Sequence, residues 1–223
     1  MINTEKLNNW YNAQAPFYHF WRDQYEGGLV REVASLMQGA RPTSVLDAGC
    51  GTGLFSIGLA RIFRECSFVG VDRSQGMIEV AHRQARKFKI DNARFELGDV
   101  QALRFERGSF DAVTAAGLFC NLDDPVPALN EFARVLKAGG RAFIVEFDRR
   151  GMTFRARVFF NAMIAGYKLV SSVFRKFRFA DAWNIEKSTI DEETFKAALS
   201  RTGYEIHAIK RRQSQLIFAC LRV

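Results

Sequence analysis

Hydrophobic and polar positions follow one another in a way that predicts strands separated by helices. Short apolar runs predict five strands: Ser44–Ala48, Phe68–Val71, Ala93–Leu97, Phe110–Ala115 and Arg141–Phe147. Apolar residues at helical spacing occupy the longer intervals between them, namely Leu54–Phe63, Ser74 to about Lys89, and Pro125–Lys137. Strands that alternate with helices in this way predict βαβ units, and therefore a parallel sheet with both faces covered.

The carboxyl-terminal part has a different pattern. Asp191–Arg201 predicts a helix, and the β-like runs Tyr204–Lys210 and Gln215–Val223 predict an antiparallel strand pair. Residues 1–40 predict a helical cap that precedes the sheet. The whole chain, residues 1–223, is therefore expected to form one α/β domain with a doubly wound, mostly parallel seven-stranded sheet.

The amino-acid composition indicates a globular protein without a membrane-spanning helix. Hydrophobic residues make up 48% of the 223 residues and charged residues 25%, which is ordinary for a globular domain. No apolar run approaches the roughly 20 residues of a membrane-spanning helix, and no secretory leader pattern follows Met1. The four cysteines form no CxxC pair, so zinc and disulfides are not expected. These features predict a cytoplasmic protein.

The net charge of +8 is concentrated in one segment. Residues 149–180 hold eight basic and no acidic residues, while the rest of the chain balances 24 basic against 24 acidic residues. Seven aromatic residues lie in the same segment. A field of this kind concentrates anionic partners near one face of a protein.

The turn after the first predicted strand carries the strongest chemical signal. Residues 45–54 read VLDAGCGTGL, so Gly49, Gly51 and Gly53 form a GxGxG pattern between a strand and a helix. Residues without a side chain let the backbone approach a ligand closely. A dinucleotide fingerprint has the spacing GxGxxG instead, which would place its third glycine at Leu54.

Acidic residues lie at the ends of the first three predicted strands. They are Asp47, Asp72 and Asp99. Open sheets of this type bind ligands beyond the carboxyl ends of their strands, where all three acids fall. Asp72 lies nineteen positions after Gly53 and is suited to accept hydrogen bonds from two ribose hydroxyls.

These motifs resemble those of the class I S-adenosylmethionine-dependent methyltransferases. The resemblance is to the type 11 group, which includes the ubiquinone- and menaquinone-biosynthesis C-methyltransferases, and it extends from about Trp10 to the end of the chain. The matching segments are 45–53, 69–72 with Ser74 and Met77, Gly98–Asp99, Phe110–Asp111, and 134–140 (RVLKAGG). The resemblance implies a Rossmann-like fold, S-adenosyl-L-methionine as cofactor and S-adenosyl-L-homocysteine as product. No cluster of metal-ligating residues appears in the sequence, so no metal is expected.

The resemblance also implies roles for individual residues. Asp47 and the backbone of the glycine turn would face the methionine portion of the cofactor, Asp72 would bind the ribose, and Met77 would pack on the adenine. Asp99 would accept a hydrogen bond from the adenine amino group, and Tyr11 and Tyr18 belong to a segment that closes over the cofactor. The expected cofactor contacts are Tyr11, Tyr18, Asp47, Gly49, Cys50, Gly51, Gly53, Asp72, Arg73, Met77, Gly98, Asp99, Val100, Ala115, Ala116 and Gly117.

One departure from the family pattern concerns the residue that could act as a catalytic base. Many relatives carry a histidine after the fourth strand, in a pattern like LHHxxDP, whereas this chain has Asn121 there, which cannot act as a base at neutral pH. His82 and His207 are expected at the surface and in a tail strand, so His19 is the one histidine to test as a catalytic base. Methyl transfer can also proceed by proximity and orientation alone, and this is the expected mechanism.

The basic aromatic segment, taken as a lid over residues 149–190, bears on the substrate. Its apolar positions have a helical period, and its basic ends suit an anionic lipid surface, so peripheral membrane contact is a second expectation beside a plain packed lid. The acceptor is expected to be small and hydrophobic or acidic: a quinone precursor, a phospholipid or a carboxylated tetrapyrrole. The expected substrate and lid residues are Asn121, Arg155, Arg157, Phe159 and Tyr167.

Two other functions fit some of these features. A basic protein could methylate RNA, but residues 115–118 read AAGL where enzymes that methylate base nitrogens carry an (N/D)PP(Y/F) loop, and no RNA-binding module is appended. The chain could also bind the cofactor as a regulatory module without turnover, which the absent histidine permits. The oligomeric state is left open by the sequence.

Overall fold

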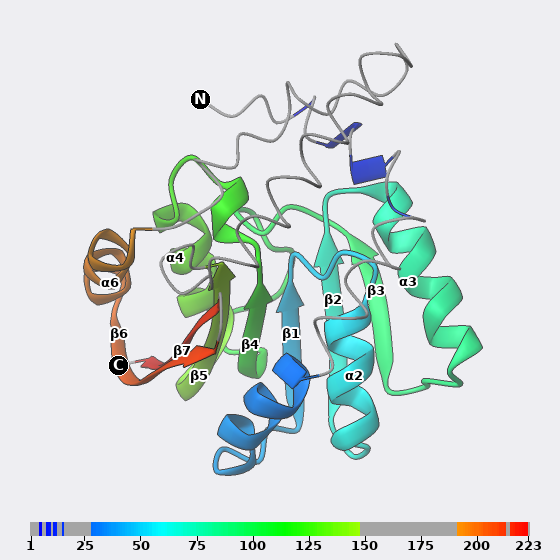
Figure 1. Cartoon of the computed structure of the whole chain (residues 1–223), viewed down its shortest axis with the longest axis horizontal. Coiled ribbons are helices and arrows are strands. Elements are labelled where there is room, and N and C mark those ends of the chain that lie inside the picture. Colours follow the sequence, from blue (N-terminus) through cyan, green and yellow to red (C-terminus); the bar gives the residue numbers. More distant parts are fainter. Residues whose placement is uncertain are drawn as a thin grey trace, which may run out of the picture.

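A seven-stranded sheet forms the centre of the computed structural model, which describes residues 5, 8, 9, 11, 12, 15, 28–147, 191–212 and 215–222. The strand order is β3-β2-β1-β4-β5-β7-β6. Five strands run parallel, and the last two add an antiparallel pair at one edge (Figure 1). The strands are β1 (Ser44–Ala48), β2 (Ser67–Asp72), β3 (Ala93–Leu97), β4 (Phe110–Ala116), β5 (Leu136–Phe147), β6 (Tyr204–Arg212) and β7 (Gln215–Arg222).

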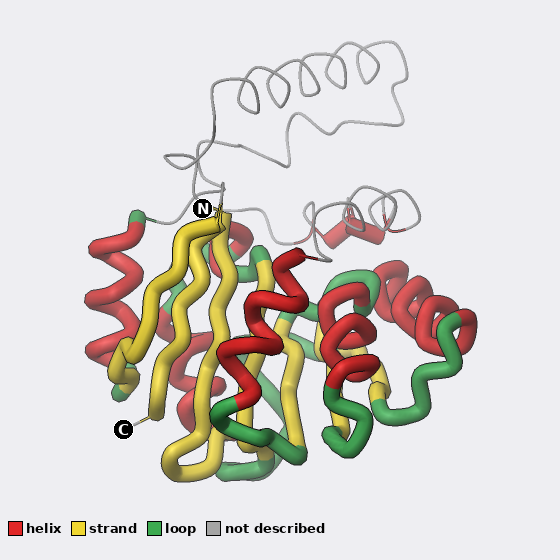
Figure 2. Tube along the Cα trace, turned by 60° about the horizontal axis from the view of Figure 1, so that its bottom comes forward, coloured by secondary structure: helices red, strands yellow, loops and turns green. Residues whose placement is uncertain are grey.

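Helices cover both faces of this sheet, as Figure 2 shows from a second direction. A helix over 28–38, α2 (Leu54–Ile62) and α3 (Gln75–Lys87) lie on one face, and α4 (Val126–Val135) and α6 (Glu192–Arg201) lie on the other. A short 3-10 helix, η1 (Phe119–Asn121), follows β4. The predicted α/β fold with a mostly parallel sheet and a terminal antiparallel pair is confirmed. Within the described ranges, no helix is both long enough and apolar enough to cross a bilayer.

Strand alternation explains the two layers of core. In β1, Val45 packs with the helix over 28–38 and α2, whereas its neighbour Leu46 packs with α4 and α6. Successive strand residues point to opposite faces, and both residues are fully buried because both faces are covered. The sheet therefore presents only its strand ends and edges for function.

The largest difference from the predicted bounds is at the start of β5, which is predicted at Arg141 and lies at Leu136. The helix predicted to reach Lys137 ends at Val135, because Leu136 pairs with Phe110 and begins β5 ahead of the Gly139–Gly140 pair. Predicted strand and helix bounds elsewhere differ by at most two residues from those observed. Ser74 caps α3 as predicted, accepting a hydrogen bond from the Met77 N–H.

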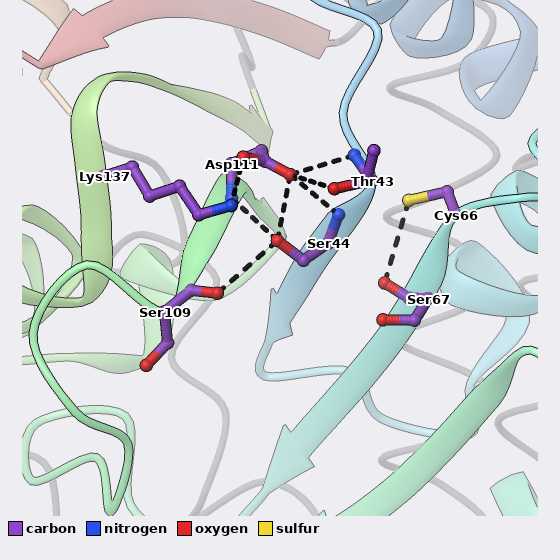
Figure 3. A network of polar contacts seen from close by, with 7 residues as sticks. All are labelled: Thr43, Ser44, Cys66, Ser67, Ser109, Asp111 and Lys137. Carbon is purple, nitrogen blue, oxygen red and sulfur yellow. Dashed lines mark hydrogen bonds and ion pairs between the residues drawn. The ribbon is translucent and has the colours of Figure 1, made fainter.

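A polar network closes the amino end of the sheet, opposite the carboxyl ends of the strands (Figure 3). The Asp111 carboxylate accepts hydrogen bonds from the backbone N–H groups of Thr43 (2.9 Å) and Ser44 (3.0 Å), from both of their hydroxyls, and from the Lys137 ammonium (2.6 Å). Burial alone would raise the pKa of this carboxyl. The hydrogen bonds from Lys137, Thr43 and Ser44 outweigh burial and hold the pKa well below its usual value.

We expect Asp111→Asn to lower the free energy of unfolding by about 1.5–3 kcal/mol at pH 7, the scale of hydrogen bonds to a charged group. A depressed pKa contributes stability that is present above the ordinary value, about 4, and is lost as pH falls toward the folded pKa. Urea unfolding at pH 7 and pH 3 measures this. The difference between wild type and variant should shrink at pH 3, and an equal difference at both pH values would contradict the ionic role.

Candidate active site

A cleft opens at the carboxyl ends of β1, β2 and β4, where the glycine turn crosses the sheet edge. Gly49, Gly51 and Gly53 all have positive φ, at 71°, 54° and 76°. The N–H groups of Gly49 and Cys50 donate to the Val71 carbonyl at 2.8 and 3.0 Å, which ties the turn to the end of β2. L-residues with side chains rarely adopt this backbone conformation, so the motif's glycines are required by the shape of the turn.

Asp72 lies at the end of β2, directly beside this turn. Its Oδ2 accepts from the Gly51 N–H and its Oδ1 from the Ser74 N–H, both at 2.9 Å. Burial raises the pKa of the Asp72 carboxyl, and the N–H groups of Ser74 and Gly51, with the charge of Arg73, oppose that rise. Each oxygen has a further lone pair, so the fixed carboxylate can accept hydrogen bonds from two hydroxyls of a ligand in the cleft.

Asp47 lies deeper, on β1, and is 1% exposed. Its Oδ1 accepts from the Thr114 hydroxyl at 2.9 Å, and its Oδ2 accepts a short hydrogen bond from the Ser56 hydroxyl. A buried carboxylate needs such partners, and here β4 and α2 supply them. Asp47 therefore forms a fixed polar floor where the cleft borders the glycine turn.

Asp99 and Arg73 lie on the outer rim of the cleft. The Arg73 guanidinium is 3.5 Å from the Asp99 carboxylate, and the two side chains are 40% and 42% exposed. The Asp99 Oδ1 also accepts from the Gln101 N–H at 2.9 Å. An exposed ion pair contributes little to stability, so this pair is free to rearrange around a ligand.

Residues of the amino-terminal segment bridge the two sides of the cleft. The Tyr11 hydroxyl donates to Asn121 Oδ1 at 3.1 Å on the η1 side. On the α3 side, Asn12 Oδ1 accepts from the Ser74 hydroxyl at 2.7 Å and from the Gly76 N–H at 2.9 Å. A Cβ at Gly76 would lie 2.8 Å from the Asn12 carbonyl oxygen, so the absence of a side chain there permits this close approach.

The structure gathers most of the predicted cofactor residues around one cleft. Of the described residues, Gly53 and Ala115 do not line it, because Gly53 packs against Phe95 and Ala81 and Ala115 is fully buried in the core. Asn121, predicted on the substrate side, lines the same cleft. The predicted residues that line it are Tyr11, Asp47, Gly49, Cys50, Gly51, Asp72, Arg73, Met77, Gly98, Asp99, Val100, Ala116, Gly117 and Asn121.

Other predicted residues lie elsewhere. His82 is exposed on α3, as predicted, and His207 is exposed on the edge strand β6. The residues outside the described ranges are Tyr18, His19, Arg155, Arg157, Phe159 and Tyr167, together with the lid segment 149–190.

Sequence reasoning missed several residues of the cleft wall. They are Thr52, Leu54, Phe55, Leu118 and Leu122. The first three neighbour the glycine motif, which could have indicated them. Leu118 and Leu122 flank η1, and their place depends on how the chain folds after β4 rather than on any motif.

Comparisons with known proteins agree with this geometry. Residues 41–203 match the family model described as a methyltransferase domain. The chain is 31% identical over 211 residues to a ubiquinone/menaquinone biosynthesis C-methyltransferase UbiE from Ectopseudomonas mendocina, an alignment that covers 90% of this chain and 82% of the relative. The chain spans only 40% or 41% of the length of three other curated relatives that it matches.

Solved structures share the fold at low identity. A [4+2]-cyclase, SpnF, has a TM-score of 0.70 and 19% identity, and the match covers 89% of this chain and 81% of that one. An S-adenosylmethionine-dependent methyltransferase from Aquifex aeolicus has a TM-score of 0.64 and 13% identity, with 89% and 100% coverage.

The strand order, the glycine turn and the carboxylates at the strand ends define a Rossmann-like α/β protein with a ligand cleft at the carboxyl ends of its strands. The chain belongs to the methyltransferase-domain family. The expectation drawn from its motifs, membership of the methyltransferases, is confirmed at the level of the family.

Proposed function

We propose that this protein transfers a methyl group from S-adenosylmethionine to a small acceptor that is hydrophobic or acidic, with a quinone precursor as the first candidate. The observation that carries the proposal is the fixed Asp72 carboxylate. It faces the cleft between the Gly51 and Ser74 N–H groups and retains lone pairs for two ligand hydroxyls.

The remaining lining fits the rest of such a cofactor. Met77, 1% exposed, and Val100, 6% exposed, supply an apolar wall for an adenine ring beside Asp99. Asp47 and the glycine turn supply a polar surface that the methionine portion can approach closely. When bound, S-adenosylmethionine supplies an electrophilic methyl group, and the protein's task is to hold the acceptor's nucleophilic atom in line with that group.

The acceptor side of the cleft is apolar and contains an amide where relatives carry a histidine. Leu118 and Leu122 line this side, and the Asn121 Nδ2 donates to the Gly117 carbonyl at 2.9 Å. This arrangement supports alignment of an already nucleophilic, hydrophobic acceptor. The quinone assignment is supported by the relative named for ubiquinone and menaquinone biosynthesis.

The fold alone does not fix the reaction, because one of the solved structures that share it is a cyclase. Calorimetric titration with S-adenosylhomocysteine, with NAD as the parallel control, tests the cofactor. We expect micromolar binding of the former and none of the latter. Release of S-adenosylhomocysteine from S-adenosylmethionine in the presence of demethylated quinone acceptors then tests turnover. If the cofactor binds but no S-adenosylhomocysteine is released with quinone, phospholipid or tetrapyrrole acceptors, a regulatory module is favoured.

The peripheral membrane contact stays a prediction, because the basic aromatic segment lies outside the described residues. Flotation with anionic vesicles, compared with neutral ones, tests it through Arg155, Arg157, Arg175 and Lys176. Wild-type protein that stays with the soluble fraction would contradict it.

A further inference from the structure

Glu146 is a buried carboxyl that the cofactor contacts leave unexplained. It lies near the carboxyl end of β5, within the apolar run FIVEF, and is 1% exposed. Its Oε1 accepts from the Phe119 N–H at 2.8 Å. The nearby N–H groups of Leu118 and Cys120, and the Cys120 thiol, which donates to the Gly117 carbonyl, also lower the pKa of Glu146. Within the described residues its Oε2 has no hydrogen-bond partner.

The loop held by Glu146 forms the acceptor-side wall of the cleft. Leu118 lines the cleft at one end of the held segment, and Asn121 lines it at the other. Asn121 in turn accepts the hydrogen bond from the Tyr11 hydroxyl. A continuous set of contacts therefore runs from the Glu146 carboxyl, through the loop backbone, to the amino-terminal segment that bridges the cleft.

We infer that Glu146 is a positioning residue: its carboxylate fixes the 118–121 loop, and so sets Asn121 and Tyr11 at the rim of the cleft. This inference rests on the proposed function, because it gives the loop a task in holding cofactor and acceptor. Glu146 does not line the cleft and is assigned no contact with either.

The protonation state of Glu146 affects both the stability of the fold and its hold on the loop. Burial raises the pKa of Glu146 to about 7, although the loop N–H groups lower it. A raised folded pKa means that the folded state takes up a proton as pH falls through 7, so the unfolding free energy contributed by this group falls as pH rises through 7. N–H groups donate stronger hydrogen bonds to an ionised carboxylate than to a protonated carboxyl. The hold of Glu146 on the loop therefore strengthens as pH rises, while its contribution to the stability of the fold falls.

Ionisation should therefore tighten the loop while it lowers the stability of the fold. On β7, Leu216 is paired with Glu146. On β5 itself, the sequence neighbours of Glu146 are Val145 and Phe147, and none of these three residues carries a charge. Among the described residues, Cys120 is the titratable group beside it, and burial is the largest cause of the raised pKa of Glu146. If Glu146 served only for packing, its replacement would lower both the Tm of the protein and its affinity for the ligand.

The test compares wild type with Glu146→Gln, which keeps the shape and removes the charge. The affinity for S-adenosylhomocysteine is measured by calorimetry at pH values from 6 to 8.5. Between these two pH values, the ratio of wild-type to variant affinity should rise about three- to tenfold, the scale of one hydrogen bond. Any titration of Asp72 is present in both proteins and cancels in this ratio. The Tm of Glu146→Gln at pH 8.5 should equal or exceed that of wild type. A constant affinity ratio across this pH range, or a Tm and affinity that fall together, would overturn the inference.

A measurement without ligand separates this inference from the proposed function. Cys50, Cys66 and Cys220 are buried and Cys120 is partly exposed, so alkylation by iodoacetamide can be followed at Cys120 by mass spectrometry. The rate is measured over a pH series and the rate constants of the thiolate are compared, which separates loop exposure from the effect of the Glu146 charge on the thiol pKa. The Cys120 thiolate should react about three- to tenfold faster in Glu146→Gln than in wild type. Asp111→Asn, at the other end of the sheet, is the matched carboxylate control and should leave this rate unchanged. Equal rates in Glu146→Gln and wild type overturn the inference. If Cys120 reacts faster in Glu146→Gln but wild type does not bind S-adenosylhomocysteine, only the proposed function is overturned.

Discussion

Asp72→Ala should weaken binding of S-adenosylhomocysteine by about 1–3 kcal/mol, roughly five- to 150-fold in Kd, as measured by calorimetry at pH 7.5. The side chain offers the ligand's hydroxyls an acceptor that the Gly51 and Ser74 N–H groups hold in place. Its removal leaves those two N–H groups and the ligand hydroxyls without their partner. Because burial raises the pKa of Asp72, we also expect wild-type affinity to fall at acid pH as this carboxyl protonates.

Two further variants make this test specific. Asp91→Ala removes an exposed carboxylate that does not line the cleft and should leave the affinity unchanged. Asp72→Asn keeps one acceptor oxygen and the volume of the side chain, and its loss should be smaller than that of Asp72→Ala. If Asp72→Ala binds with wild-type affinity while folded, Asp72 does not contact the ligand.

Gly53→Ala should lower the free energy of unfolding by about 2–4 kcal/mol, because it combines backbone strain with overpacking. Gly53 has a φ of 76°, and a Cβ there would lie 2.8 Å from the Phe95 ring and 3.0 Å from the Ala81 Cβ. Those neighbours belong to β3 and α3, so the third glycine of the motif is required for packing α2 against its surroundings. Urea unfolding measures the loss.

Gly139→Ala is the matched control for this effect. Gly139 has almost the same φ, 74°, but a Cβ at this position would have no heavy atom within 4 Å. Its substitution should therefore cost only the strain of the left-handed conformation, about 1–2 kcal/mol. Equal losses for the two variants would show that packing at Gly53 contributes nothing beyond backbone strain.

Much of the fold was predictable because local signals and burial agree. β1 and β3 begin and end where their apolar runs do, and Ser74 caps α3 as its side chain predicts. The end of α4 was not predictable from its own residues. Leu136 continues the helical period, but its pairing with Phe110 in the sheet determines its conformation. The helical period also predicts Phe88 on the buried face of α3, yet Phe88 follows the last helical residue and is 41% exposed.

The candidate site was predictable only where a motif marks it. Asp47, Asp72 and Asp99 follow from the rule that ligands bind at strand ends, and all three line the cleft. Asn12 was not predictable, because its role arises from a contact across 62 residues with Ser74. Glu146 lies within a predicted strand, and a charged residue in such an apolar run is a signal that a buried carboxyl lies there.

The place of β7 has a consequence for how the chain acquires its fold. β7 follows β6 in the sequence but lies between β5 and β6 in the sheet, pairing with both. During synthesis, β6 leaves the ribosome with no strand to pair with, since β5 is reached only through β7. The edge of β5 can therefore be covered only after β7 has been synthesised. Until then, the nascent domain exposes the apolar edge of β5, which is the period when a chaperone would be most needed.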